Sequence, residues 1–196
     1  VPIEFDYKNH HVISFAPPSS GGILIAQMMK MIAPFDIAKM GYQSPEAVGL
    51  MVESQRRAYA DRAEHMGDPD FWKVPTRTLI SDAYAKQRMK DYVPGIAGNS
   101  KNTIAGQAKE SEQTTHYSVI DKEGNMVAIT TTLNDSYGNK TVVAGAGFIL
   151  NNEMDDFSVK PGVPNMFGAL GGEANAIAPG KRMLSSMTPT LVTVNN

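Results

Sequence analysis

The feature that most constrains this chain is an abrupt change of character between residues 113 and 114. Upstream, apolar residues recur mainly at helical spacing, and downstream they alternate with polar residues in short β-rich runs. Residues 1–113 are therefore predicted to be mostly helical and to end in a mobile loop over 95–113, which is rich in Gly, Ser, Asn and Lys. Residues 114–196 are predicted to be β-rich, so the expected fold class is α+β.

Three helices are predicted in the first part. An apolar run over residues 23–32 predicts the first, and we interpret Ser19-Ser20 before it as a helix cap rather than an anion site. Ser44-Pro45-Glu46 predicts the start of the second, because proline is favoured at the first helical position, and Gly67 is its expected end. The third is predicted over residues 81–92.

A β-hairpin is predicted at the start of the second part. Residues 116–121 and 125–133 are β-rich runs, and Lys122-Glu123-Gly124 joins them. Three residues with glycine last form a good hairpin loop, because glycine readily takes the left-handed conformation.

The hairpin register places three polar residues on one face. If Asp121 pairs with Asn125, Thr114 lies directly opposite Thr132, and directly opposed residues point to the same face. Asn134 shares that face through the two-residue period of a strand. The register therefore places Thr114, Thr132 and Asn134 together.

The rest of the second part alternates short strands and long loops. Residues 148–150 predict a short strand that leads into an acidic run, and residues 189–194 predict the last strand. Between them, the Gly-, Pro- and Asn-rich stretch 161–180 is long for a compact domain, which is typical of a functional or disordered loop.

Composition excludes several classes of function. Hydrophobic residues make up 42% of the chain and charged residues 19%, as in globular proteins. A net charge of -2 with no basic cluster argues against nucleic acid as a partner. The absence of cysteine excludes disulfides and thiolate sites, and the four histidines lack metal-ligand spacing. No run approaches the roughly 20 apolar residues of a membrane helix; because no signal peptide is present in these residues, we expect targeting information to lie outside them.

The motif Thr114-Thr115-His116-Tyr117-Ser118-Val119 resembles the start of the small subunit of γ-glutamyltranspeptidases. The similarity extends over nearly the whole chain, in Pro17-Pro18-Ser19-Ser20-Gly21-Gly22, Ala60-Asp61-Arg62, Gly67-Asp68-Pro69-Asp70, Thr132-Leu133-Asn134, Asn151 to Ser158, Lys160-Pro161-Gly162, Gly171-Gly172-Glu173-Ala174-Asn175-Ala176 and Leu184-Ser185-Ser186-Met187. It implies part of the four-layer αββα sandwich of N-terminal-nucleophile hydrolases. Residues 1–113 would be the C-terminal part of the large subunit and 114–196 the N-terminal part of the small subunit, both made from one precursor.

The resemblance implies a threonine nucleophile that is released by self-cleavage. Thr114 would first attack the Gln113–Thr114 bond, and its freed α-amine would then act as the base for its own hydroxyl. An unperturbed α-amine titrates at about 7.7–8.0, which suits catalysis near neutral pH. Thr132 would position the nucleophile. The resemblance implies γ-glutamyl transfer to water or to amino-acid or peptide acceptors, from glutathione or other γ-glutamyl compounds, without a metal or organic cofactor.

The resemblance also implies a set of substrate-binding residues. Asn134, Glu153 and Asp156 would hold the ends of the γ-glutamyl group, with both acids pairing to its ammonium. The hydroxyls of Ser185 and Ser186 would donate to the α-carboxylate. Taken without the resemblance, the acidic run is more typical of a turn or helix cap, and the serine pair of a loop.

A lid over the substrate is implied for residues 161–172, with glycines as hinges and Phe167 as the aromatic residue that closes. The substrate-clamping arginine and the oxyanion-hole glycines of the family are not found in these residues. A periplasmic or secreted location is also implied by the resemblance.

Two other interpretations remain open. One is a β-lactam (cephalosporin or glutaryl) acylase of the same superfamily, against which the retained α-amino-acid recognition residues argue. The other is an unprocessed, inactive fragment with a structural or binding role, which a continuous Gln113–Thr114 bond would favour.

Overall fold

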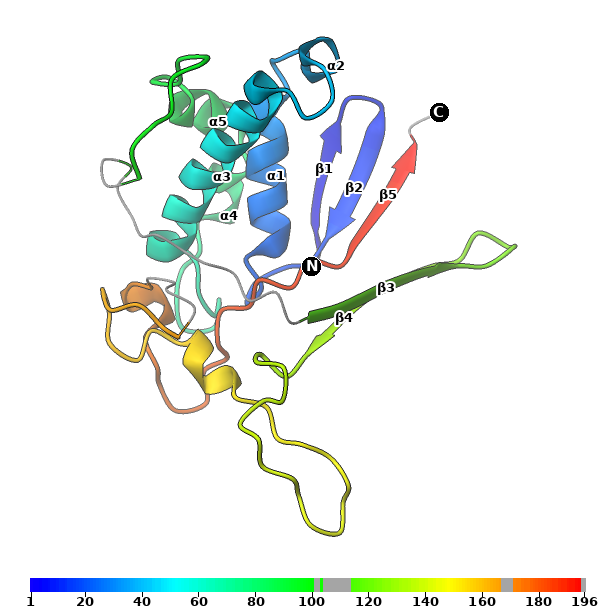
Figure 1. The fold of residues 1–196 in the computed structure, drawn as a ribbon, viewed down its shortest axis with the longest axis vertical. Helices are drawn as coiled ribbons and strands as arrows, with labels where there is room; N and C mark the ends of the chain where they lie inside the picture. The colour runs from blue at the N-terminus through cyan, green and yellow to red at the C-terminus, as the bar shows by residue number, and fades with distance from the viewer. Residues whose placement is uncertain (101–102, 104–113, 167–170, 195–196) are drawn as a thin grey trace.

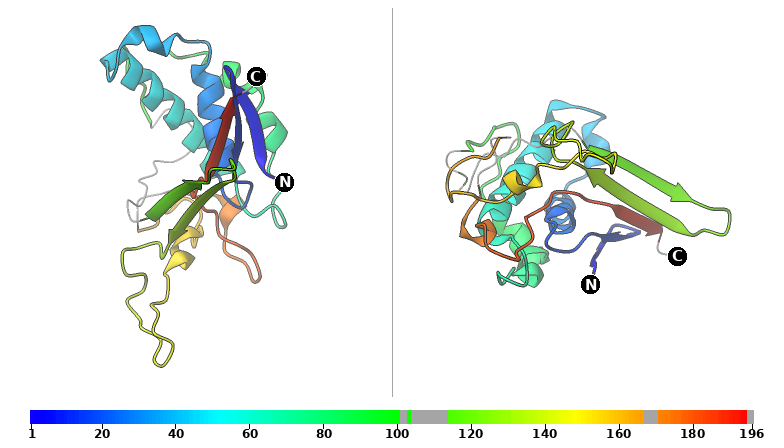
Figure 2. Two further views of the ribbon diagram at one scale, coloured as in Figure 1. Left: turned by 90° about the vertical axis from the view of Figure 1, so that its right-hand side faces the viewer. Right: turned by 90° about the horizontal axis from the view of Figure 1, so that it is seen from below.

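A computed structural model describes residues 1–100, 103, 114–166 and 171–194. Helices cover one face of a three-stranded sheet, and a separate two-stranded hairpin extends beside that sheet (Figures 1 and 2). This mixed architecture agrees with the predicted α+β class.

The three-stranded sheet joins the two ends of the chain. It consists of β1 (Ile3–Tyr7), β2 (His10–Ser14) and β5 (Thr190–Val194), antiparallel in the order β1-β2-β5. Strand β5 confirms the predicted last strand. The helical character expected of the first part does not extend to β1 and β2. In β1, buried Ile3 and Phe5 alternate with exposed neighbours, which is the pattern of a strand.

The helical layer contains all three predicted helices; α1 and α3 lie close to their expected bounds. Helix α3 begins after Ser44, whose hydroxyl accepts the N–H of Ala47 at 3.1 Å, as a helix cap should. Helix α5 has the same kind of cap at Ser81 but ends at Arg88, so its predicted end at residue 92 is wrong. The helices are α1 (Gly21–Ile32), α2 (Ile37–Met40), α3 (Pro45–His65), α4 (Thr76–Leu79) and α5 (Asp82–Arg88).

The helix cap expected at Ser19-Ser20 is formed in part: the hydroxyl of Ser19 accepts the N–H of Gly21, the first residue of α1, at 3.3 Å, but Ser20 does not cap. Ser20 has helical backbone angles and its hydroxyl makes no cap hydrogen bond to α1. That hydroxyl instead donates to the carbonyl of Ser185, a residue far away in sequence. At Ser20, a tertiary contact therefore takes the place of a cap hydrogen bond.

Helix α1 lies at the centre of the core. Its Ile23, Leu24 and Ala26 are buried against the sheet and against α3. Burying one large apolar side chain stabilises a fold by about 1.5–3 kcal/mol, so this helix fixes α3 firmly relative to the sheet. Within the described ranges, no helix is long and apolar enough to cross a bilayer.

The predicted hairpin is confirmed with its register. Strands β3 (Thr114–Ile120) and β4 (Met126–Thr132) are antiparallel, and Thr114 pairs with Thr132. Gly124 takes a φ of 86°, the left-handed conformation expected of the loop glycine.

The strand predicted over residues 148–150 is wrong. These residues belong to a projecting loop in which only Ile149 forms a bridge, to Val142 (Figure 1). Within the described residues, the segment pairs with its own loop and with no neighbouring sheet, so a ladder does not develop. Of the mobile loop expected over 95–113, residues 101–102 and 104–113 lie outside the described residues.

Candidate functional site

Two threonine hydroxyls lie on the same face of the β3–β4 hairpin. Thr114 is exposed at the first position of β3, directly opposite Thr132. The hydroxyl oxygen of Thr132 accepts the N–H of Asn134 at 2.9 Å, which fixes its position. Gln113, on the other side of the expected cleavage point, lies outside the described residues.

Asn134 connects this hairpin to the acidic segment. It is buried and adopts a φ of 74°, a left-handed conformation that asparagine tolerates better than most residues. Its side-chain amide donates to the carbonyl of Asn152 at 3.3 Å, and the side chain of Asn152 accepts the N–H of Asp135 at 2.9 Å. These bonds hold the end of β4 beside the start of the acidic segment.

The acidic segment forms a single 3₁₀ turn, η1 (Glu153–Asp156), which agrees with the turn that its composition alone predicts. Burial raises the pKa of Asp156 to about 6, although the charge of Arg62 opposes the shift. Burial also raises the pKa of Glu153. Both carboxylates are therefore partly desolvated without a full counter-charge, so a bound ammonium group would stabilise their charged forms.

Ser185 and Ser186 lie on an extended segment against the N-terminal end of α1. The carbonyl of Ser185 accepts hydrogen bonds from both the N–H and the hydroxyl of Ser20, each at 2.8 Å. Its N–H donates to the carbonyl of Pro18 at 3.2 Å. The segment is thus fixed through its backbone.

Arg62 is the first of two residues at this site for which the sequence analysis predicted no role. It extends from α3, and its Nε donates to the hydroxyl of Ser20 and its Nη2 to the hydroxyl of Ser186, each at 3.0 Å. Burial lowers its pKa to about 10, and the charge of Asp156 opposes this shift. Arg62 therefore links the serine segment to the acidic segment electrostatically; its only sequence signal was its place in the Ala60-Asp61-Arg62 motif.

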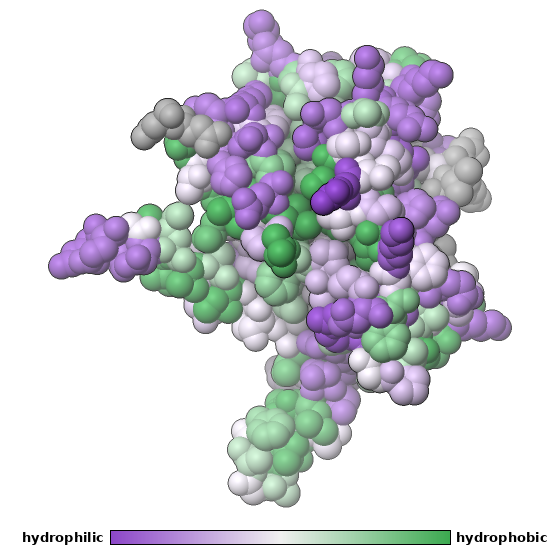
Figure 3. Space-filling view, turned by 180° about the vertical axis from the view of Figure 1, so that it is seen from behind, coloured by the Kyte–Doolittle hydropathy of each residue, from purple (hydrophilic) through white to green (hydrophobic). Residues whose placement is uncertain are grey.

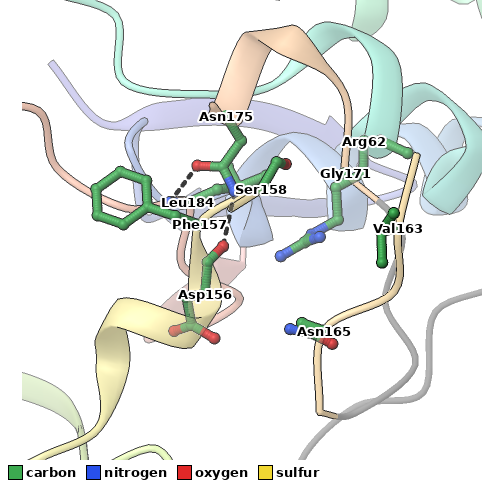
Figure 4. A pocket seen from close by; sticks show the side chains of 10 residues that line it. Arg62, Asp156, Phe157, Ser158, Val163, Asn165, Gly171, Asn175 and Leu184 are labelled. Atoms are coloured by element: carbon green, nitrogen blue, oxygen red, sulfur yellow. Dashed lines mark hydrogen bonds between the residues drawn. The ribbon is translucent and has the colours of Figure 1, made fainter. Parts of the chain in front are cut away.

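Asn175 is a second residue without a predicted role. It lies in η2 (Glu173–Asn175) and is buried. Its side-chain amide donates to the carbonyl of Asp156 at 2.7 Å, and its side-chain oxygen accepts the N–H of Leu184 at 3.0 Å (Figure 4). One side chain therefore sets the distance between the acidic turn and the serine segment.

An ion pair holds the other end of the serine segment. The buried carboxylate of Asp68 accepts hydrogen bonds from the backbone N–H of Arg182 and from its guanidinium. These bonds lower the pKa of Asp68 to about 2. The pair connects the segment before Ser185 to the turn that follows α3.

A small pocket lies between these elements. Arg62 enters it from α3 and Asp156 borders it from η1, while Val163 and Asn165 line it from the loop that follows (Figure 4). The same loop is held to η1 where the N–H of Met166 donates to the side chain of Asp155 at 3.0 Å. Phe167, expected to be the aromatic residue of a lid, lies outside the described residues.

The predicted site residues thus lie in two groups in the structure. Thr114 and Thr132 form one on the hairpin, and Asn134 follows two residues after β4 ends; its left-handed backbone breaks the strand period that was expected to place it on their face. Asp156 and Ser186 form the other, around Arg62. The bonds that link Asn134 and Asp135 to Asn152 join the hairpin to the acidic segment, which carries Asp156.

Comparison with known proteins identifies the family of this chain. A family model described as gamma-glutamyltranspeptidase matches residues 1–196. A glutathione hydrolase proenzyme of Escherichia coli is 50% identical over 193 residues, covering 97% of this chain and 33% of that protein. The chain spans about a third of the length of the curated relatives it matches.

Two solved structures share the fold. The crystal structure of cephalosporin acylase from Bacillus halodurans matches 100% of this chain and 32% of its own, with a TM-score of 0.76; its identity of 23% shows the fold alone. The crystal structure of Helicobacter pylori gamma-glutamyltranspeptidase matches 57% of this chain and 32% of its own, with a TM-score of 0.52 and 34% identity. Because the family model matches over the whole length, this chain belongs to the gamma-glutamyltranspeptidase family.

Proposed function

We propose that the protein transfers γ-glutamyl groups from glutathione or other γ-glutamyl amides to water or to amino-acid and peptide acceptors. One observation carries this proposal: Arg62 brings a desolvated acid, Asp156, and an exposed hydroxyl, Ser186, to the same site. An acid and hydroxyl donors are the groups that the ammonium and carboxylate of an α-amino acid require. Glu153, Asn134 and Ser185 complete the proposed binding set.

Thr114 is the proposed nucleophile in two reactions. In the precursor, its Oγ attacks the carbonyl carbon of Gln113; the peptide C–N bond breaks, the hydroxyl proton passes to the departing nitrogen, which becomes the α-amine of Thr114, and water then hydrolyses the resulting ester. In the mature protein, Oγ attacks the γ-carbonyl of the donor while the α-amine takes the hydroxyl proton and delivers it to the leaving amine. The γ-glutamyl ester then reacts with water or with an acceptor amine. Thr132 positions Thr114, and these steps require no metal or organic cofactor.

The architecture we propose is part of a four-layer αββα sandwich made of two subunits. Residues 1–113 would be the C-terminal part of the large subunit and residues 114–196 the N-terminal part of the small one. In support, the hairpin and the 141–150 loop expose apolar side chains that further layers of the protein could cover (Figure 3), among them Val119, Ile120, Val127, Val142, Phe148 and Leu150. A periplasmic or secreted location completes this proposal.

A lid over residues 161–172 is also proposed, with Phe167 as its closing residue. Residues 163 and 165 line the pocket, and the N–H of Gly162 donates to the carbonyl of Gly171 at 3.0 Å, so the two ends of the loop lie together. Such a loop can move as a unit over a ligand. Removing the aromatic ring by Phe167→Ala should shift the products towards hydrolysis.

A cephalosporin acylase activity is the second candidate, which the sequence analysis left open and which the shared fold does not exclude. The acid and hydroxyl groups around Arg62 favour the γ-glutamyl donor, because an acyl group without an α-amino-acid end would leave them unpaired. Comparing turnover of γ-glutamyl p-nitroanilide with that of a glutaryl cephalosporin distinguishes the two candidates.

The test of the proposed function uses the full-length protein. Mass spectrometry should show two chains, the second beginning at Thr114, and γ-glutamyl p-nitroanilide should be hydrolysed. Thr114→Ala should abolish both reactions, while Thr114→Ser should retain some of each because a hydroxyl remains. A Thr114→Ala protein that still splits at this bond would remove Thr114 from the mechanism; an unsplit wild-type protein would favour an inactive fragment.

A further inference from the structure

The serine segment contains two hydroxyls whose hydrogen-bond directions are set by the protein. The Oγ of Ser185 accepts the backbone N–H of Met187 at 3.1 Å, and the Oγ of Ser186 accepts Nη2 of Arg62 at 3.0 Å. Over the ranges that the structure describes, neither hydroxyl donates to a protein acceptor. Each oxygen therefore accepts one hydrogen bond from the protein, and each hydroxyl hydrogen is available to a ligand.

The direction of these bonds matters because a hydroxyl can both donate and accept. A guanidinium has only donors, so Ser186 must accept in this contact. The hydroxyl hydrogen of Ser186 then has to point elsewhere, and Ser186 is exposed to a ligand. A hydroxyl that accepts from a cation is also polarised, which makes it a stronger donor.

The second contact of Arg62 holds the guanidinium in place. Its Nε donates to the hydroxyl of Ser20, and that hydroxyl donates in turn to the carbonyl of Ser185. Arg62, Ser20 and the backbone of Ser185 thus form a chain in which every donor direction is fixed. The guanidinium cannot rotate away from Ser186 without breaking it.

From this arrangement we infer that Arg62 is a positioning residue: it occupies the oxygen of Ser186 as an acceptor, so that the hydroxyl of Ser186 donates to the α-carboxylate of the substrate. This inference rests on the proposed function and assigns a new role within that site. Arg62 acts through the serine hydroxyl, and its charge also favours a carboxylate over a neutral group at this position. It should therefore determine selectivity for substrates that carry an α-carboxylate.

The experiment compares two substrates of the full-length protein: γ-glutamyl p-nitroanilide and 4-aminobutanoyl p-nitroanilide, which lacks only the α-carboxylate. In Arg62→Met, KM for the glutamyl substrate should rise about tenfold or more, since a charge-assisted hydrogen bond is lost. The kcat should change little, and kcat/KM for the 4-aminobutanoyl substrate should stay within about twofold. Arg62→Lys, which keeps the charge but reaches one hydroxyl at most, should lie between these limits.

A double-mutant cycle tests the route through the hydroxyl. In a Ser186→Ala background, Arg62→Met should have a much smaller effect on KM for the glutamyl substrate. Arg56→Met is the matched control, because Arg56 also lies on α3 and donates to a serine hydroxyl, that of Ser100, away from the pocket. Its substrate preference should equal that of the wild type.

Two results would overturn the inference. One is an unchanged preference between the two substrates in both Arg62→Met and Arg62→Lys. The other is an Arg62→Met effect that is the same with and without Ser186. A wild-type protein that turns over neither substrate would instead refute the proposed function, so the two failures are distinguishable.

Discussion

Replacing Asp68 by asparagine should measure how strongly the serine segment is held to the helical layer. The carboxylate of Asp68 is 1% exposed and accepts four hydrogen bonds. They come from the backbone N–H groups of Arg182 and Asp70, at 2.8 and 3.2 Å, and from Nε and Nη2 of Arg182, at 3.0 and 2.5 Å. An asparagine of the same shape can keep acceptors on one side only, and its NH₂ group would face the donors of Arg182.

The expected loss of stability follows from the burial of the two partners. Breaking a fully buried ion pair by removing one charge costs about 3–5 kcal/mol. Here the side chain of Arg182 is 51% exposed and can regain water, so we expect Asp68→Asn to lower the free energy of unfolding by about 2–4 kcal/mol. Asp70→Asn is the matched control: its carboxylate contacts the same guanidinium at 2.7 Å but is 73% exposed, so its loss should cost about 0–1 kcal/mol.

The assay is urea unfolding of the full-length protein and both variants between pH 2 and pH 7. Hydrogen bonds from Arg182 lower the pKa of Asp68 from 3.8 to about 2. A lowered carboxyl pKa gives stability that is present above the unfolded value and is lost as the pH falls through the folded one. The difference between wild type and Asp68→Asn should thus be constant above about pH 5 and shrink between pH 4 and pH 2. A loss below 1 kcal/mol, or one that does not depend on pH, would refute the reasoning.

Three further predictions address the site. Because burial raises the pKa of Asp156 to about 6, KM for a γ-glutamyl anilide should rise as the pH falls below 6 and the carboxylate is protonated; in Asp156→Asn, KM should be high at every pH in a steady-state pH profile. Asn134→Ala should be less stable than Asn134→Gly by about 1 kcal/mol in thermal unfolding, since only glycine accepts the φ of 74° without strain, and equal stability would contradict this. Gly67→Ala should lower the free energy of unfolding by about 1–3 kcal/mol, because its Cβ would lie 2.1 Å from the carbonyl oxygen of Ala174; an unchanged melting temperature would show that the backbone yields easily.

Local signals predicted the elements that depend on local chemistry. The loop ending at Gly124 fixed the register that sets Thr114 against Thr132, because hairpin geometry is decided within a few residues. The helix start at Ser44 was likewise predicted from its neighbours, and its cap is present. Resemblance, rather than periodicity, supplied the roles proposed for Asp156 and for the serine pair.

What could not be predicted depends on contacts between distant residues. Ser20 looked like a helix cap, but its hydroxyl bonds to Ser185 and Arg62 instead. The bond between Arg62 and Ser186 joins residues 124 positions apart, and no periodicity encodes such a pair. Strand β1 was missed for a different reason: its alternation of buried and exposed residues is clear, but it occupies only five residues at the start of a mostly helical part.

The contacts that hold the serine segment, which carries two of the proposed recognition residues, span the proposed cleavage point and do not require the bond there. The pairing of β2 with β5, the bonds from Ser20 to Ser185 and the ion pair of Asp68 with Arg182 all join residues before 101 to residues after 170. Cutting the chain at 113–114 would remove none of them. The acid and hydroxyl groups can therefore be in place before self-cleavage, and what the cut supplies is the α-amine of Thr114, at an exposed position on the hairpin. On this view, self-cleavage creates the catalytic base, the α-amine of Thr114, at a site whose proposed substrate-binding residues are already in place.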